Sequence, residues 1–462
     1  MKLWQKDKTA LGEVDKFTVG NDRELDLYLA PFDVLGSIAH VTMLESVGLL
    51  QKDEMELLVA ELKNIYKKIV PEETCTAESS STFSYTRSVD GDFKLDEGVE
   101  DIHSQVELML TQKLGDVGKK IHSARSRNDQ VLVDLKLFLR SEIESLTGEV
   151  KTLFDLLIQQ SEKYKYDLLP GYTHLQLAMP SSFGLWFGAY AESLVDDLIT
   201  LEAAFEVVNK NPLGSAAGYG SSFPINRKMT TELLGFEDLN YNVVYAQMGR
   251  GKTERIVASA LANIAATLAK LSMDACLFLN QNFAFISFPD ELTTGSSIMP
   301  HKKNPDVFEL IRAHCNRIQA LPNEIMLMTA NLPSGYHRDL QLLKEHIIPA
   351  FENLQACLRM AGLMLTSIQV KENMLEDEKY KYLFSVEEVN KLVLEGVPFR
   401  DAYKKIGSEI EQGRFAYTVS VNHTHEGSIG NLCNEQITRN MDKILDRFNF
   451  SKINKALQQL LQ

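Results

Sequence analysis

Two long apolar stripes constrain the fold of this chain more than any other feature of its sequence. The first recurs at steps of three or four residues from Leu132 to Leu157, and the second does so from Val257 to Phe278. Such steps place apolar side chains along a single face of an α-helix, close to the heptad spacing of coiled coils. Each stripe therefore predicts a helix of about six turns or more that buries one face against other helices.

The rest of the chain favours a mainly all-α fold. Ser182–Val208 and Pro305–Met328 are also long and helix-compatible, and most prolines fall at the joints between such segments. A bundle of long helices fits this pattern, and stripes of this length often pack against copies of the same chain. We therefore expect a homo-oligomer.

The length of 462 residues and the changes of pattern along the chain predict three domains. Residues 1–124 form an expected N-terminal, mainly helical domain, which includes a Ser- and Thr-rich loop between Pro71 and Gly98. Residues 125–375 contain the long helices. Beyond residue 375 the runs become shorter, so residues 376–462 form an expected small helical domain.

The formal net charge of −15 argues against a nucleic-acid partner, which would need clustered Lys and Arg. The five cysteines are widely spaced and form no CxxC, so we expect reduced thiols and no metal site. The first residues are mostly polar, and no stretch of 18 uninterrupted apolar residues follows. We expect a cytoplasmic protein without a membrane partner.

Gly295–Asp306, GSSIMPHKKNPD, is the strongest candidate for a functional loop. Hydroxyls, backbone amides and lysines converge within a dozen residues. Such a loop can bind a carboxylate and stabilise negative charge that develops beside it during proton abstraction.

Three further segments are candidates, each with an ordinary structural alternative. In HSARSRNDQ, from His122, Arg125, Arg127 and Asn128 precede a long helix, where they can hold a carboxylate. The alternative is an N-terminal cap, in which Ser126, Asn128 or Asp129 satisfies the first amides and the arginines are solvated. GYTHLQ places Thr173 and His174 in an expected turn between helices, and histidine suits proton transfer at neutral pH. YHRDLQLLK, from Tyr336, is either a substrate clamp or an exposed polar face.

MGRGKT, from Met248, ends in the GKT of the phosphate-binding motif GxxxxGK[ST]. The first glycine of that motif would have to be at position 246, which is an alanine, so nucleotide binding is not expected.

Together these motifs resemble the argininosuccinate lyase branch of the fumarase and aspartase superfamily over nearly the whole chain. The matching segments, in order, are DVLGSIAH, EDIH, RSRND, GYTHLQ, NPLGSAAG, GSSIMPHKKNPD and YHRDLQ. The resemblance implies a three-domain helical fold, whose long helices assemble in a homotetramer into a twenty-helix core with active sites shared between three subunits. It also implies reversible elimination of argininosuccinate to arginine and fumarate, in arginine biosynthesis and without a cofactor.

The resemblance further implies roles for individual residues. Ser296 matches the catalytic base, His174 paired with Glu309 matches a proton-transfer group, and Lys302 matches a residue that holds the succinyl carboxylates. The implied substrate contacts are Asp101, Arg127, Asn128, Thr173, Arg250, Asn304, Tyr336, Gln341 and Lys344. Because a serine hydroxyl is a weak base at neutral pH, an alternative makes Ser296 an oxyanion donor and His174 the base.

Some segments depart from the branch. The opening LWGGRF becomes LWQKDK, a serine near the substrate is replaced by Asp22, the segment around Arg250 becomes QMGRGKT, and Val386–Asn390 replaces TDLAD. Another fumarate-releasing lyase and a non-catalytic structural relative remain alternatives, which the released product would distinguish.

Overall fold

The structure is a computed structural model that describes residues 12–70 and 93–462. The LWQKDK departure, Cys75 and most of the expected Pro71–Gly98 loop lie outside the described residues. The described part of the chain is mainly helical, as predicted, and its strands are short. The remaining four cysteines are free thiols.

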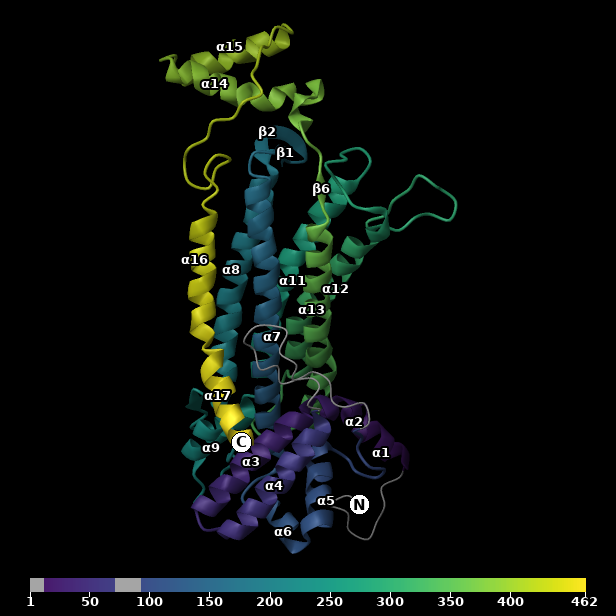
Figure 1. Cartoon of the computed structure of the whole chain (residues 1–462), viewed down its shortest axis with the longest axis vertical. Coiled ribbons are helices and arrows are strands. Elements are labelled where there is room, and N and C mark those ends of the chain that lie inside the picture. Colours follow the sequence, from purple (N-terminus) through teal and green to yellow (C-terminus); the bar gives the residue numbers. More distant parts are fainter. Residues whose placement is uncertain (1–11, 71–92) are drawn as a thin grey trace.

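Five long helices lie side by side along the molecule (Figure 1). They are α7 (Arg127–Lys163), α8 (Phe183–Val208), α11 (Lys252–Leu279), α12 (Asp306–Met328) and α13 (Leu343–Thr366). Every residue of both apolar stripes is buried, from Leu132 to Leu157 in α7 and from Val257 to Phe278 in α11. The predicted bundle is therefore confirmed, although Pro322 and Pro349 lie inside helices and not at joints.

The N-terminal helices pack against one end of this bundle (Figure 1). They are α1 (Gly12–Val19), α2 (Asp22–Leu25), α3 (Ala30–Ser46), α4 (Lys52–Ile69), α5 (Ile102–Leu114) and α6 (Asp116–Lys119), with 3₁₀ turns η1 (Asp26–Leu29) and η3 (Lys120–His122). Asp22–Ser46 and Lys252–Leu279 are long and apolar enough to cross a membrane, but 83% and 50% of their apolar windows are buried inside the fold. Their composition is that of core helices.

Short elements connect the long helices. The antiparallel hairpin β1 (Leu168–Thr173) and β2 (Gln176–Ser182) joins α7 to α8. Between α8 and α11 lie β3 (Lys210–Asn211), α9 (Arg227–Leu233), β4 (Asp238–Leu239) and α10 (Val243–Met248). Beyond α11 come β5 (Ile286–Ser287), η4 (Asp290–Leu292), η5 (Arg338–Leu342), β6 (Gln369–Val370), η6 (Met374–Glu376) and η7 (Glu378–Phe384).

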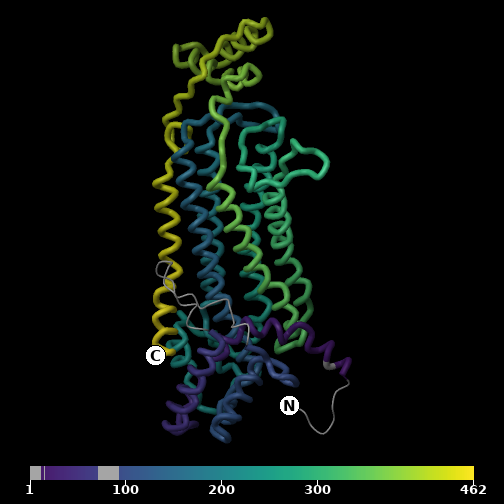
Figure 2. The backbone as a smooth tube through the Cα atoms, turned by 45° about the vertical axis from the view of Figure 1, so that its right-hand side comes forward, coloured from purple at the N-terminus to yellow at the C-terminus, as the bar shows by residue number. Residues whose placement is uncertain are grey.

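The C-terminal segment divides between two places. Helices α14 (Ser385–Leu394) and α15 (Phe399–Glu411) form a separate small core at the end of the bundle opposite the N-terminal helices. Helices α16 (Asn434–Phe448) and α17 (Phe450–Leu461) then run back along the bundle, where Phe448 packs on Phe205 of α8 (Figure 2). The expected domain boundaries at residues 124 and 375 stay predictions.

Candidate active site

A pocket lies where the N-terminal helices meet the bundle. It is lined by Asp22, Asp26, Glu100, Asp101, His103, Arg127, Asn128, Val131, Arg250, Tyr336, Arg338, Gln341 and Lys344. These residues come from α2 with the adjoining turn η1, the start of α5, the start of α7, the turn before α11, and the segment from Tyr336 into α13. The pocket thus brings together seven of the predicted substrate contacts.

The start of α7 is fixed by a capping box. Ser126 caps the helix, and the Oδ1 atom of Asp129 accepts the Ser126 amide at 2.9 Å. The Oδ2 atom of Asp129 accepts the amides of Gly214 and Ala216, at 2.9 and 2.8 Å. The capping alternative is therefore confirmed for Ser126 and Asp129, and it leaves Arg127 and Asn128 of the first turn lining the pocket.

Arg127 organises the acidic wall of the pocket. Its guanidinium lies 3.0 Å from Asp101 Oδ2 and 3.6 Å from Glu100 Oε2, and it donates to Ser104 Oγ at 2.7 Å. Burial alone would raise the pKa of Asp101, but His103, Arg127 and hydrogen bonds from Ser104 hold this pKa below its usual value. Asp101 is therefore an ionised acceptor at neutral pH.

A second group of charged side chains in the pocket centres on Lys344 of α13. Its ammonium lies 2.5 Å from Asp26 Oδ1 and also pairs with Asp22. Burial would lower the pKa of Lys344, but both carboxylates raise it, so the lysine stays charged. Gln341 donates to the carbonyls of Thr18 and Val19 at 3.1 and 3.2 Å, and therefore also fixes the end of α1.

Arg250 lines the pocket but its guanidinium is engaged elsewhere. It lies 3.1 Å from Glu254 and donates to the Leu340 carbonyl at 2.9 Å. The QMGRGKT segment around it forms the end of α10 and the turn into α11, with Gly251 at a φ of 80°. The segment thus follows a helix, α10, and leads into another helix, α11.

The loop Gly295–Asp306 lies apart from this pocket and projects from the side of the bundle before α12 (Figure 2). Its base is closed by a bridge in which Asn304 donates to the Thr294 carbonyl at 2.8 Å. Ser296 Oγ accepts the amides of Met299 and Ile298 at 3.2 and 3.4 Å. Two amides thus point at the hydroxyl oxygen, as an oxyanion at that atom would require.

Thr173 and His174 lie in the hairpin at the end of the bundle far from the pocket (Figure 1). The expected turn between helices is in fact this hairpin, with His174 and Leu175 at φ values of 54° and 58°. His174 and Glu309 are both exposed, and no contact between them occurs among the described residues. One chain therefore presents the predicted site in three separate parts: the pocket, the loop and the hairpin.

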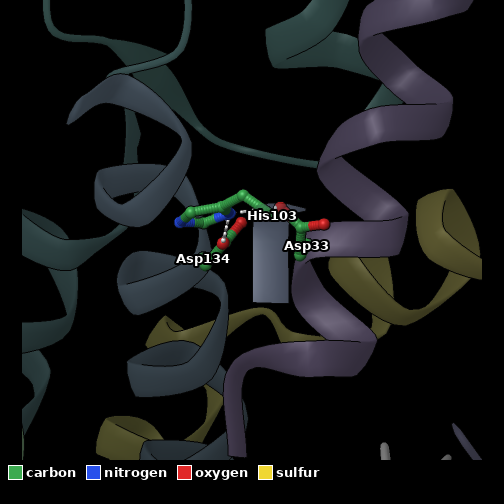
Figure 3. A group of neighbouring side chains, drawn as sticks. All are labelled: Asp33, His103 and Asp134. Atoms are coloured by element: carbon green, nitrogen blue, oxygen red, sulfur yellow. Dashed lines mark hydrogen bonds and ion pairs between the residues drawn. The ribbon is translucent and has the colours of Figure 1, made fainter. Parts of the chain in front are cut away.

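His103, which also lines the pocket, lies between two buried carboxylates, Asp33 of α3 and Asp134 of α7 (Figure 3). Its Nδ1 atom is 2.7 Å from Asp33 and 3.5 Å from Asp134. Burial would lower the pKa of His103, but the two aspartates raise it to about 9. These three side chains could surround a metal ion. The raised pKa favours a protonated His103 at neutral pH, and a protonated Nδ1 would donate to Asp33 within an ion-pair network.

Several residues of the pocket had received no role from the sequence. Asp26, Glu100, His103 and Arg338 line it, and Glu100 and His103 stand within the EDIH motif. Glu100 could have been predicted from the sequence, because it is next to the predicted contact Asp101. Asp26 could not, because it is more than 70 residues away in sequence from Ile102, whose amide it accepts.

Comparisons with known proteins agree with this fold and with the motifs. Residues 55–320 match the family described as Lyase. The chain is 63% identical to "Argininosuccinate lyase" of Parabacteroides distasonis, over all of this chain and 99% of that protein, and 62% identical to "Argininosuccinate lyase" of Bacteroides fragilis strain YCH46 over the same shares. A crystal structure of EDDS lyase in complex with formate shares the fold with a TM-score of 0.71, 20% identity, and coverage of 98% of this chain and 95% of that one.

These findings define a carbon–nitrogen lyase with the helical fold of the fumarase and aspartase superfamily. Within that class, the chain belongs to the argininosuccinate lyase family.

Proposed function

We propose that the protein catalyses the reversible elimination of argininosuccinate to arginine and fumarate in arginine biosynthesis. The observation that carries the proposal is the pocket, which gathers seven predicted substrate contacts from four distant segments. It offers both cationic and anionic groups, as a substrate with carboxylates, an amine and a guanidinium requires.

In this proposal the reaction begins with removal of a proton from the succinyl carbon next to a carboxylate. Ser296 takes this proton, and the amides of Met299 and Ile298 stabilise the oxygen that accepts it. Negative charge then develops on the neighbouring carboxylate, which Lys302 and Asn304 hold. The alternative, with Ser296 as oxyanion donor and His174 as base, requires the same loop.

The bond between carbon and nitrogen then breaks, and the guanidinium of arginine leaves with a proton. His174, oriented by Glu309, supplies or relays that proton, and Thr173 contacts the substrate. Asp101, Arg127, Asn128, Arg250, Tyr336, Gln341 and Lys344 bind the substrate from the pocket.

We infer that the complete site forms in a homotetramer, where the loop, the hairpin and the pocket of three subunits meet. Bundle helices present exposed apolar side chains that favour such assembly. Examples are Leu310 and Leu327 of α12 and Leu363 of α13, which are 61%, 64% and 51% exposed. A mass in light scattering of four times the 52.1 kDa chain mass would support this assembly, and the mass of a monomer would contradict it.

We place the enzyme in the cytoplasm, without nucleic-acid or membrane partners.

The test is to incubate the purified protein with argininosuccinate and to measure fumarate by ultraviolet absorbance and arginine by amino-acid analysis. Equal amounts of both products are expected. Aspartate, malate and adenylosuccinate serve as alternative substrates, and release of ammonia, water or a purine nucleotide would identify a sister lyase. If none of these substrates gives a product, the enzymatic function is contradicted.

A further inference from the structure

Four carboxylates line the pocket, and three of them have both oxygens engaged. Asp26 meets Lys344 through Oδ1 and accepts the Ile102 amide through Oδ2. Asp101 accepts Ser104 through Oδ1 and pairs with Arg127 through Oδ2. Glu100 pairs with Arg338 through Oε1 and with Arg127 through Oε2. These three groups are committed to the protein itself.

Asp22 differs from the other three. Its Oδ1 atom pairs with Lys344, whereas its Oδ2 atom meets no donor among the described residues. The Asp22 side chain is 16% exposed and lines the pocket, so a ligand can reach this oxygen.

The charges around Asp22 do not balance. Two carboxylates, Asp22 and Asp26, share the single ammonium of Lys344, whose side chain is only 4% exposed. The next cation, Arg250, is already paired with Glu254. Burial first, and then repulsion from Asp26, raise the pKa of Asp22 above its usual value. The pocket wall therefore has one negative charge more than its own cations neutralise, and a bound cation would be stabilised there.

The substrate offers a suitable cation. The substrate's guanidinium is part of the bond that breaks, so it must lie beside the catalytic groups. The α-ammonium group of the arginine part is therefore the cation that remains to pair with Asp22. Resting on the proposed function, we propose that Asp22 is a specificity-determining residue that binds the α-ammonium group of arginine and of argininosuccinate. The resemblance had placed a serine at this position, which could accept a hydrogen bond but could not neutralise the charge.

The experiment measures binding of arginine and of 5-guanidinopentanoate, which is arginine without its α-amino group, by calorimetry on the assembled enzyme. The wild-type enzyme should prefer arginine by about tenfold to a hundredfold, the range of one charge-assisted hydrogen bond. Asp22→Asn should remove this preference by weakening arginine alone. Asp22→Ser, a smaller neutral side chain, should do the same, and Asp116→Asn, at an exposed residue of α6, should match the wild type.

Two results would overturn the proposal. In the first, Asp22→Asn keeps the preference for arginine. In the second, Asp22→Asn weakens the binding of both ligands equally, which would mean that Asp22 acts only through Lys344. Thermal unfolding of each variant identifies those that do not fold, and if Asp22→Asn is one of them, Asp22→Ser decides the same comparison. Because binding is measured without turnover, the result does not depend on argininosuccinate cleavage. Failure of the proposed function would appear separately, as absence of fumarate in the activity assay.

Discussion

At the scale of single residues, the contacts of Ser296 bear directly on its chemistry. A serine hydroxyl can act as a base only if its environment stabilises the alkoxide, and two backbone amides point at Ser296 Oγ. Both donors belong to the loop itself, so this environment moves with the serine. The same donors would also support an oxyanion role, and the two roles differ in whether Ser296 itself takes the succinyl proton.

Replacing Ser296 with alanine separates these two assignments. If the serine is the base, Ser296→Ala should lower turnover by about a thousandfold or more and abolish exchange of the succinyl proton with deuterated solvent. Nuclear magnetic resonance of recovered argininosuccinate measures that exchange. Exchange at the wild-type rate in a variant that still binds substrate would exclude the serine base and favour His174.

A second residue-scale prediction concerns His103 and pH. Its pKa is about 9 in the fold and about 6.5 in the unfolded chain, so its stabilising contribution is complete below pH 6.5 and is lost as the pH rises to 9. The groups that face it are Asp33, Asp134 and Asp101. The contribution is on the order of 3 kcal/mol. Unfolding of the wild type and of His103→Gln, measured between pH 6 and 9.5, should differ by that loss, and parallel curves would contradict it.

At the scale of secondary-structure elements, the first turn of α7 connects fold and site. Asp129 accepts three backbone amides, two of them from residues 214 and 216, which are far along the chain. It therefore fixes the helix that presents Arg127 and Asn128 to the pocket.

Removing the Asp129 carboxylate should destabilise the protein strongly. Asp129→Ala leaves three amides without acceptors, which should cost roughly 3 kcal/mol or more in the free energy of unfolding and should weaken substrate binding. Asp155→Ala is the control on the same helix, because Asp155 is exposed and, in the described part of the chain, pairs only with Lys151. Denaturant unfolding of both variants measures the difference, and equal stabilities would show that Asp129 is dispensable.

The secondary-structure elements differ in how well the sequence predicted them. The apolar stripes of α7 and α11 predicted the bundle, because a helix that buries one face has apolar residues every three or four positions. The hairpin at 168–182 left no such record, since its strands are short and several of its side chains are exposed. Motifs predicted seven residues of the pocket, but the Asp22 oxygen without a donor could be found only from the contacts of its neighbours.

At the scale of the whole molecule, one chain keeps its predicted catalytic residues far from the pocket that its predicted substrate contacts line. The hairpin and the pocket lie at opposite ends of the bundle, and the loop projects from its side (Figures 1 and 2). A rigid bundle of five long helices cannot fold its two ends together. If these residues serve one reaction, different subunits must supply them.

Mixing two inactive variants tests that conclusion. Ser296→Ala and His174→Asn should each be nearly inactive as pure tetramers. If each site takes its loop and its hairpin from different subunits, random hybrid tetramers contain some sites in which both residues are native. With equal amounts of the two chains, about a quarter of the sites qualify, because two independent choices must both be favourable. Coexpressed, differently tagged chains purified through both tags should therefore recover up to about a quarter of wild-type activity per site. Hybrids confirmed by native mass spectrometry that stay as inactive as their parents would mean that the two residues act from the same chain or not in one site.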